Sequence, residues 1–150
     1  MTMSRALPGL LVVIVAVVAA CSSSSPAGSA AGPTSAGQSS EGTQTSDGGQ
    51  VTVVVDWAGP AAGAAFDVKL DTHSVDLDAL DLAGATLRND RGETLTASAW
   101  VAPKGGHHRE GALTFDGNAT AFFAGAKWIE LVITGVGDLP ERTLRWDVGS

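Results

Sequence analysis

The sequence predicts an all-β protein, a single antiparallel β-sandwich of immunoglobulin-like size with about seven strands. Two observations carry this prediction. Apolar residues in the second two-thirds of the chain recur at every second position, which is the period of a half-buried strand. The alternating stretches are short, and turn signals such as Gly59-Pro60 and Asn89-Asp90-Arg91-Gly92 separate them. A set of short strands broken by turns is typical of a two-layer β-domain.

The chain begins with the layout of an export signal. Arg5 supplies positive charge, and an apolar run of 11 residues, 10–20, follows it. A helix that crosses a bilayer needs about 20 apolar residues, so this run is too short to remain as a membrane helix. We therefore expect residues 1–20 to be a cleaved signal peptide.

The cleavage point resembles the lipobox of bacterial lipoproteins, which is an aliphatic residue, two small residues and a cysteine. Here the four positions are Val18-Ala19-Ala20-Cys21. The resemblance implies that Cys21 becomes the N-terminus, is linked through its sulfur to diacylglycerol and carries fatty acids such as palmitate. It also implies that the membrane is a partner and that the protein faces the extracytoplasmic side of the bacterial cell envelope. The alternative is a secreted protein with an incidental thiol.

Residues 21–50 have the composition of a linker. From Ser22 to Gln50 the chain consists of Ser, Gly, Ala, Thr, Pro and Gln with one Glu and one Asp, and it contains none of the large apolar residues. Such a segment cannot bury enough apolar surface to offset the entropy of ordering it. We expect it to be a disordered tether between the lipidated cysteine and the folded domain. Because Cys21 is the only cysteine, no intrachain disulfide can form in that domain.

Residues 51–150 form one domain by length. The expected strands are 51–57, 66–70, 86–88, 95–101, 113–115, 129–133 and 144–148. Trp100 and Trp128 fall on the polar side of this alternation. They either pack beneath loops or form an exposed aromatic binding surface for sugar rings or a partner protein.

This domain resembles a group of uncharacterised exported bacterial β-domains. The resemblance rests on Leu70-Asp71-Thr72-His73-Ser74-Val75-Asp76-Leu77-Asp78 and on Gly105-Gly106-His107-His108. It implies the all-β fold and transfers no catalytic role to any residue.

The histidines suggest a metal site. His73 follows the second expected strand, and His107 and His108 follow the fourth. If every connection reverses the chain, these loops meet at one end of the sandwich, where Asp71 can join them. Imidazole and carboxylate ligands suit copper or zinc. The alternative is that the histidines are solvated or serve loop structure, since no established metal spacing is present.

Two other site classes are disfavoured. The carboxylates of Asp76, Asp78 and Asp81 lack the glycine and closing glutamate of a calcium loop, so a solvated acidic edge is the better interpretation. No nucleophile motif or dinucleotide-binding glycine pattern occurs, and we expect no enzyme and no organic cofactor.

Charge and anchor together define the expected function. The net charge of −7 comes with no basic cluster, which excludes nucleic acid as a partner on electrostatic grounds. We expect a membrane-anchored lipoprotein that acts as a non-catalytic binding or envelope-interaction module, with an envelope protein as its partner. The alternatives are a copper- or zinc-binding module and a purely structural envelope protein.

Overall fold

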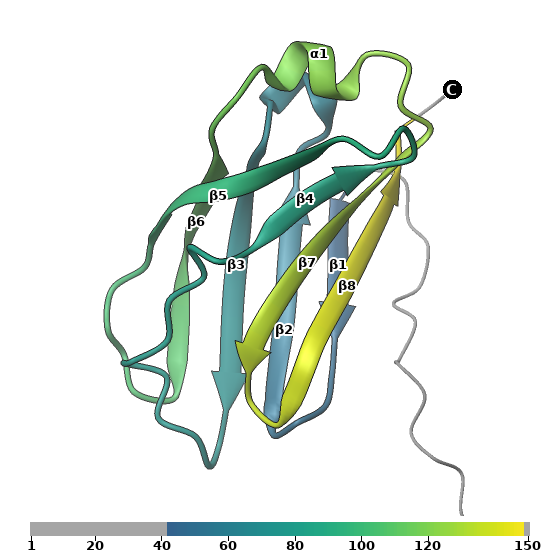
Figure 1. The fold of residues 1–150 in the computed structure, drawn as a ribbon. Helices are drawn as coiled ribbons and strands as arrows, with labels where there is room; N and C mark the ends of the chain where they lie inside the picture. The colour runs from purple at the N-terminus through teal and green to yellow at the C-terminus, as the bar shows by residue number, and fades with distance from the viewer. Residues whose placement is uncertain (1–41, 149–150) are drawn as a thin grey trace, which may run out of the picture. The chain divides into compact units, whose positions relative to one another are not determined.

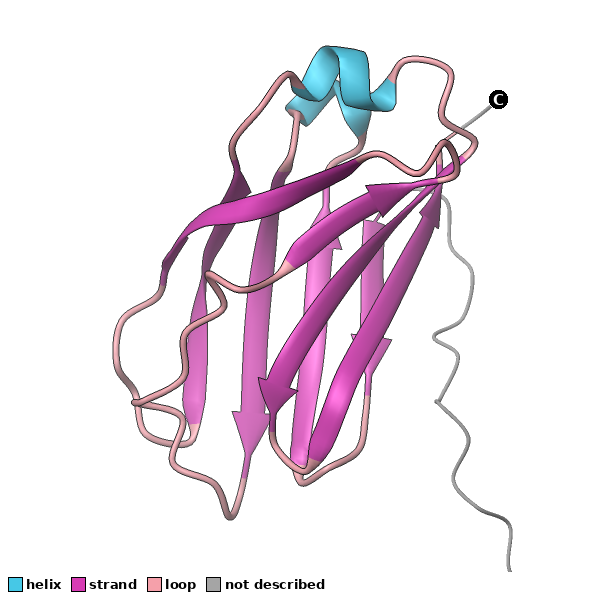
Figure 2. Ribbon diagram, in the orientation of Figure 1, coloured by secondary structure: helices cyan, strands magenta, loops and turns pink. Residues whose placement is uncertain are grey.

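The computed structural model describes residues 42–148, and it is all-β. Eight strands form one antiparallel sheet in the order β1-β2-β3-β6-β5-β4-β7-β8. In Figure 1, β4, β7 and β8 lie in front of β1, β2 and β3, and Figure 2 shows how little of this domain is helical. The elements are β1 Gly42–Ser46, β2 Val51–Trp57, a 3-10 turn Pro60–Ala62, β3 Ala65–Thr72, β4 Thr86–Asn89, β5 Thr94–Val101, β6 His108–Phe115, α1 Ala119–Phe123, β7 Trp128–Val136 and β8 Leu139–Asp147.

The fold-class prediction is confirmed, with one strand more than expected. The predicted signal peptide (1–20), Cys21 and the linker up to residue 41 lie outside the described residues. The last part of the predicted linker is β1, which pairs along its whole length with β2. The sequence pattern misses this strand because its buried side chains are polar, Gln44 and Ser46.

The core lies between the two layers and is lined by the alternating residues of the strands. In β2, Val53 and Val55 have no exposed surface. Trp57, Phe66 and Trp146 form an aromatic group at its centre, with ring centroids 5.5–6.0 Å apart. Aromatic side chains bury the largest apolar area per residue, so this group provides much of the burial that holds the layers together.

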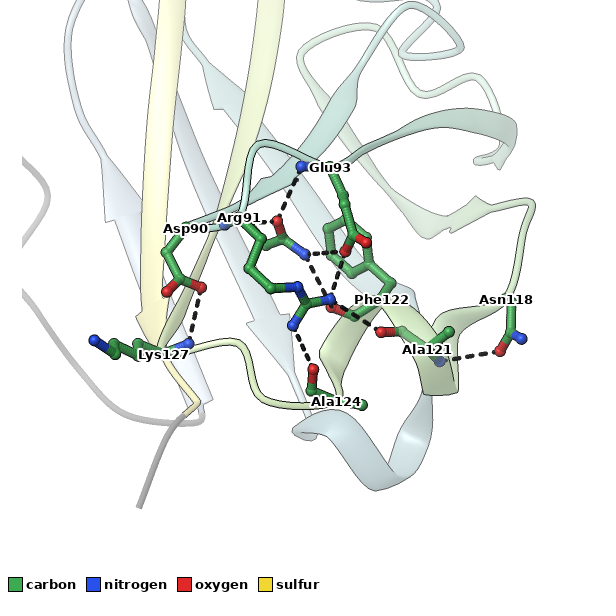
Figure 3. A network of polar contacts seen from close by, with 9 residues as sticks. Asp90, Arg91, Glu93, Asn118, Ala121, Phe122, Ala124 and Lys127 are labelled. Atoms are coloured by element: carbon green, nitrogen blue, oxygen red, sulfur yellow. Dashed lines mark hydrogen bonds and ion pairs between the residues drawn. The ribbon is translucent and has the colours of Figure 1, made fainter.

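One end of the sandwich is closed by α1. Phe122 and Phe123 of this short helix are buried. Asn118 caps it by accepting a hydrogen bond from the Ala121 N–H. Arg91 binds carbonyl groups at its C-terminal end, including that of Ala124 (Figure 3). We call this the helix end. Gly42 and Val148 also lie here, because Gly42 pairs with Trp57 and Val148 follows β8.

β5 joins the two layers through an irregularity. Its first residues pair with β4, and its second half pairs with β6. The register shifts between Ala97 and Ala99, which is the signature of a β-bulge. The bulge reverses which side chains face inward beyond it. Trp100, which the simple alternation placed on the polar side, lies opposite Leu113 and packs against the core.

Candidate functional site

Four connections meet at the end of the sandwich opposite α1. They are residues 47–50, 73–85, 102–107 and 137–138, and we call them together the loop end. β1, β3 and β7 run toward this end in Figure 1, and β6 starts from it. These connections include the loop of His73 and the loop that leads to His107 and His108, which the sequence predicted to meet at one end if every connection reverses the chain.

Gln50 ties three of these connections together. Its amide Nε2 donates to Asp138 Oδ2 at 2.6 Å, and its Oε1 accepts from Ser74 Oγ at 2.7 Å. Its backbone carbonyl accepts from the hydroxyl of Thr72. Gln50 is the one non-glycine residue of the described chain with a positive φ, 67°. This conformation is unfavourable for a side chain with a Cβ and persists where surrounding contacts fix it.

Arg109 organises the other side of the loop end. Its side chain is 8% exposed and donates to four backbone carbonyls, those of Leu77, Leu80, Ala102 and Pro103, at 2.7–3.2 Å. Its guanidinium also lies 4.2 Å from the ring centre of Trp100. A planar guanidinium suits this combination of stacking and several donors. Arg109 therefore fixes two loops on β6.

Asp78 closes the loop that holds the histidine pair. Its Oδ1 accepts hydrogen bonds from the backbone N–H groups of Gly105 and Gly106, both at 2.9 Å. The Gly106 bond in particular, with the Gly105 bond and the nearby charges of Lys104 and Arg109, holds the pKa of Asp78 below its ordinary value of 3.8, against an opposing effect of desolvation. Its carboxylate is a structural acceptor, which accounts for one of the three aspartates of the calcium interpretation.

The candidate metal residues divide into two groups. Asp71 and His108 are neighbours on β3 and β6, and His108 Nδ1 donates to Asp71 Oδ1 at 2.5 Å. These two and His73 line one open depression of about 510 Å³, together with Gln50, Thr52, Thr72 and Ser74. His107 is not among the lining residues, because its Nδ1 donates to the carbonyl of Val75 at 2.9 Å.

Within residues 42–148, no three His, Cys, Asp or Glu side chains are close enough together to hold a metal ion. A second open depression, of about 410 Å³, is lined by Val75 together with Asp76, Asp81 and Asp138. The loop end is thus an acidic surface with three exposed histidines, of which His73 and His108 share a depression and His107 does not. Sequence reasoning missed Gln50 and Arg109, because neither residue stands in a motif and their partners are distant in sequence.

The two tryptophans do not share a surface. Trp100 packs against the core beneath Arg109. Trp128 lies on the outer side of β7, where the guanidinium of Arg145 covers its ring at 4.1 Å from the centre. Arg145 and Arg88 also pair with Glu130, at 3.4 and 2.7 Å. This outer face of β4, β7 and β8 is therefore a row of paired charges, with the ring of Trp128 partly covered.

Comparison with known proteins gives no relative: no protein family, no curated protein and no solved structure matches this chain. In the part of the chain that the structure describes, no helix has the length and apolar character to cross a membrane.

Proposed function

We propose that this chain is an exported lipoprotein whose β-domain binds a partner in the cell envelope through the loop end, without catalysis. The observation that carries the proposal is the placement of the loop end relative to Gly42. The residues that precede Gly42 join the domain at the helix end, and the loops lie at the opposite end of the strands. The chain that leads to the anchor therefore enters the domain at the helix end, so that this connection does not cover the loop end.

The anchor rests on Cys21 and the lipobox around it. A diacylglycerol with further acyl chains contributes about 0.8 kcal/mol per buried methylene, and two or more chains give stable attachment to a bilayer. The linker after Cys21 allows the domain to reach partners beyond the headgroups.

The stiffness of the loop end supports a binding role. Loops held by Gln50, Asp78 and Arg109 are already ordered before a partner arrives. Ordering loops on binding costs free energy, so preorganised loops retain more of the contact energy as affinity. The two depressions are open rather than enclosed, which suits the surface of a macromolecule better than a small molecule that needs burial on most sides.

The binding role is tested by capture of envelope proteins with two matched variants. The chain with Asp71→Ala, His73→Ala and His108→Ala changes only exposed residues of the loop end, and the control chain with Arg88→Ala, Glu130→Ala and Arg145→Ala changes the outer face of β7. We expect the same set of captured proteins from wild type and control, and loss of about tenfold or more from the loop-end variant, as for removal of interface anchors. Equal capture by the loop-end variant rejects the proposal, and loss only in the control moves the interface to the Trp128 face.

A second candidate function is binding of copper or zinc at His108, and the Asp71 hydrogen bond favours it. A carboxylate that accepts from Nδ1 fixes the imidazole and leaves Nε2 free as a ligand, which is the usual outer-shell arrangement of a metal-bound histidine. His73 is the second imidazole of the same depression. Water molecules would complete the coordination, and Asp71 would orient His108 rather than bind the metal.

Isothermal titration of the chain with Cu(II) and with Zn(II) tests this site, with His107→Ala as the matched control. We expect His108→Ala and His73→Ala to abolish the binding heat and His107→Ala to preserve it, because His107 faces the carbonyl of Val75. No heat from the wild-type chain at micromolar metal, or an equal loss in all three variants, excludes the site as drawn.

A further inference from the structure

β1 is attached to the sheet differently from the other strands. It is one end of the strand order, and β8 is the other end. Backbone pairing connects β1 to β2, while side chains of β8 reach its free edge: Trp146 Nε1 donates to Gly42 O at 2.9 Å, and Arg142 Nη1 donates to Ser46 O at 2.8 Å. β1 therefore occupies a slot between β2 and β8 that accepts an extended segment.

The strand in this slot contributes no large apolar side chain. Its sequence is Gly-Thr-Gln-Thr-Ser, and the buried apolar residues of the domain begin at Val51. What holds β1 is its backbone hydrogen bonds and the polar contacts of Gln44 and Ser46. These contacts form whenever a strand of this sequence pairs with β2 in the same register. They are therefore the same whether the strand belongs to the same molecule or to a second one.

The turn that returns β1 to its own sheet contains one strained residue. Gly48, Gly49 and Gln50 have positive φ in succession, at 129°, 55° and 67°. Glycine adopts such values without penalty, so the strain lies at Gln50. A Cβ on Gly49 would lie 2.9 Å from the backbone nitrogens of Asp138 and Leu139, so position 49 accepts only glycine. A short connection with a strained residue favours exchange of a terminal strand, because the exchanged form keeps the strand contacts and releases Gln50 from its positive φ.

We propose that β1 exchanges between two copies of this chain, so that residues 42–46 of one molecule occupy the slot between β2 and β8 of the other. The partner is thus a second copy, and the interface repeats the contacts of the monomer with a two-fold relation. On the proposed function, the lipid anchors hold neighbouring copies on one surface, which raises their effective concentration for exchange. The exchange itself does not require the anchor and is tested without it.

Cysteines at a directly paired position decide whether β1 exchanges. Thr45 and Val54 lie opposite each other on β1 and β2, and neither is a buried residue. The chain 21–150 with Cys21→Ser, Thr45→Cys and Val54→Cys is kept reduced at millimolar concentration, then diluted and oxidised with oxidised glutathione. We expect a disulfide-linked dimer on a non-reducing gel, because exchanged strands place the two cysteines in different molecules. Disulfides within single chains alone, with no covalent dimer, overturn the proposal.

A variant that removes the positive-φ penalty at Gln50 distinguishes exchange of β1 from other kinds of dimer formation. Gln50→Gly removes the positive-φ penalty from the closed turn, so the dimer fraction measured by light scattering at equal concentration should fall about fivefold or more. Ala58→Gly introduces a glycine at an exposed position near the helix end, outside the turn, and should leave the dimer fraction unchanged. A dimer fraction that stays unchanged in Gln50→Gly does not depend on the closed turn and rejects the inference.

Discussion

At the scale of residues, two buried arginines donate hydrogen bonds to backbone carbonyls instead of pairing with a carboxylate. Arg109 and Arg142 are 8% and 3% exposed, and both direct their guanidinium groups to backbone carbonyls. Burial lowers the pKa of Arg142, with the charge of Asp47 acting in the opposite direction. A guanidinium keeps its charge at all ordinary pH values, so these carbonyl dipoles must replace the water that it has lost. Each arginine consequently fixes several loop segments at once.

Asp78 predicts a specific acid response. Because its folded-state pKa is below 3.8, the ionised carboxylate stabilises the fold above that value, and this contribution is lost as the pH falls through the folded pKa. We expect Asp78→Asn to be less stable than wild type near pH 6 and the difference to shrink toward zero below pH 3.8. Urea unfolding across this pH range measures it.

The matched variant Asp78→Ala removes the acceptor as well as the charge. It should be less stable than Asp78→Asn at every pH while sharing its flatter acid dependence, because neither variant titrates at this position. Parallel stability curves for wild type and Asp78→Asn would contradict the assignment of the acid response to this carboxylate.

At the scale of elements, the β1–β2 and β7–β8 turns are packed against each other through glycines. The Asp138 N–H donates to Gly49 O at 3.0 Å, and a Cβ on Gly137 would lie 2.0 Å from that same oxygen. No side chain fits between the two turns. This close approach holds the two turns in direct backbone contact at the loop end.

The glycine contact is tested by a pair of alanine substitutions in one hairpin. Gly135 and Gly137 both have positive φ, 72° and 64°, but a Cβ on Gly135 meets nothing within 4 Å. We expect Gly135→Ala to cost about 1 kcal/mol from φ alone, and Gly137→Ala to cost about 3 kcal/mol or more because the Gly49 backbone must move. Urea unfolding gives both values, and equal losses would show that the turns separate freely.

The bulge in β5 is the element that decides what faces inward on that strand. One extra residue near Ser98 moves Trp100 from the outer side to the core side, where Arg109 stacks on it. The same irregularity lets β5 leave β4 and join β6, so the two layers are parts of one sheet. A surface role for Trp100 is therefore disfavoured on packing grounds, whereas Trp128 stays on an outer face.

At the scale of the whole molecule, both ends of the described chain lie at the helix end, and the histidines lie at the other. If the lipobox interpretation holds, Cys21→Ser removes the acyl chains and transfers the protein from the membrane fraction to the soluble fraction, since one polar residue cannot replace the anchor. Fractionation with immunoblotting measures the distribution. Mass spectrometry of the N-terminal peptide should find residue 21 acylated in the wild type and not acylated in the variant.

If the Cys21→Ser variant stays in the membrane fraction, the lipid at Cys21 is not the anchor. The uncleaved signal peptide would then be the segment that holds the protein in the membrane. The variant with His107→Ala serves as the control for expression and fractionation, because its substitution lies in the folded domain and leaves Cys21 intact.

The sequence by itself determined the fold class, the presence of the strands β2 to β8 and the meeting of the histidine-bearing loops at one end. It missed the first five residues of β6, including His108, and the first five residues of β8. The correct predictions follow from local information: a period of two identifies a half-buried strand, and alternating chain direction places every second loop together. The lipobox is also local, and it remains a prediction from the sequence.

Only the tertiary structure decided which residues act together. β1 has no apolar pattern. Its backbone pairs with β2, and Arg142 and Trp146, about 100 residues further along the chain, bind its carbonyls. The separation of His107 from Asp71 and His108, and the position of Gln50 among three loops, likewise depend on hydrogen bonds between distant segments. A sequence pattern records which side of a strand is buried, but not which distant atom completes a buried polar group.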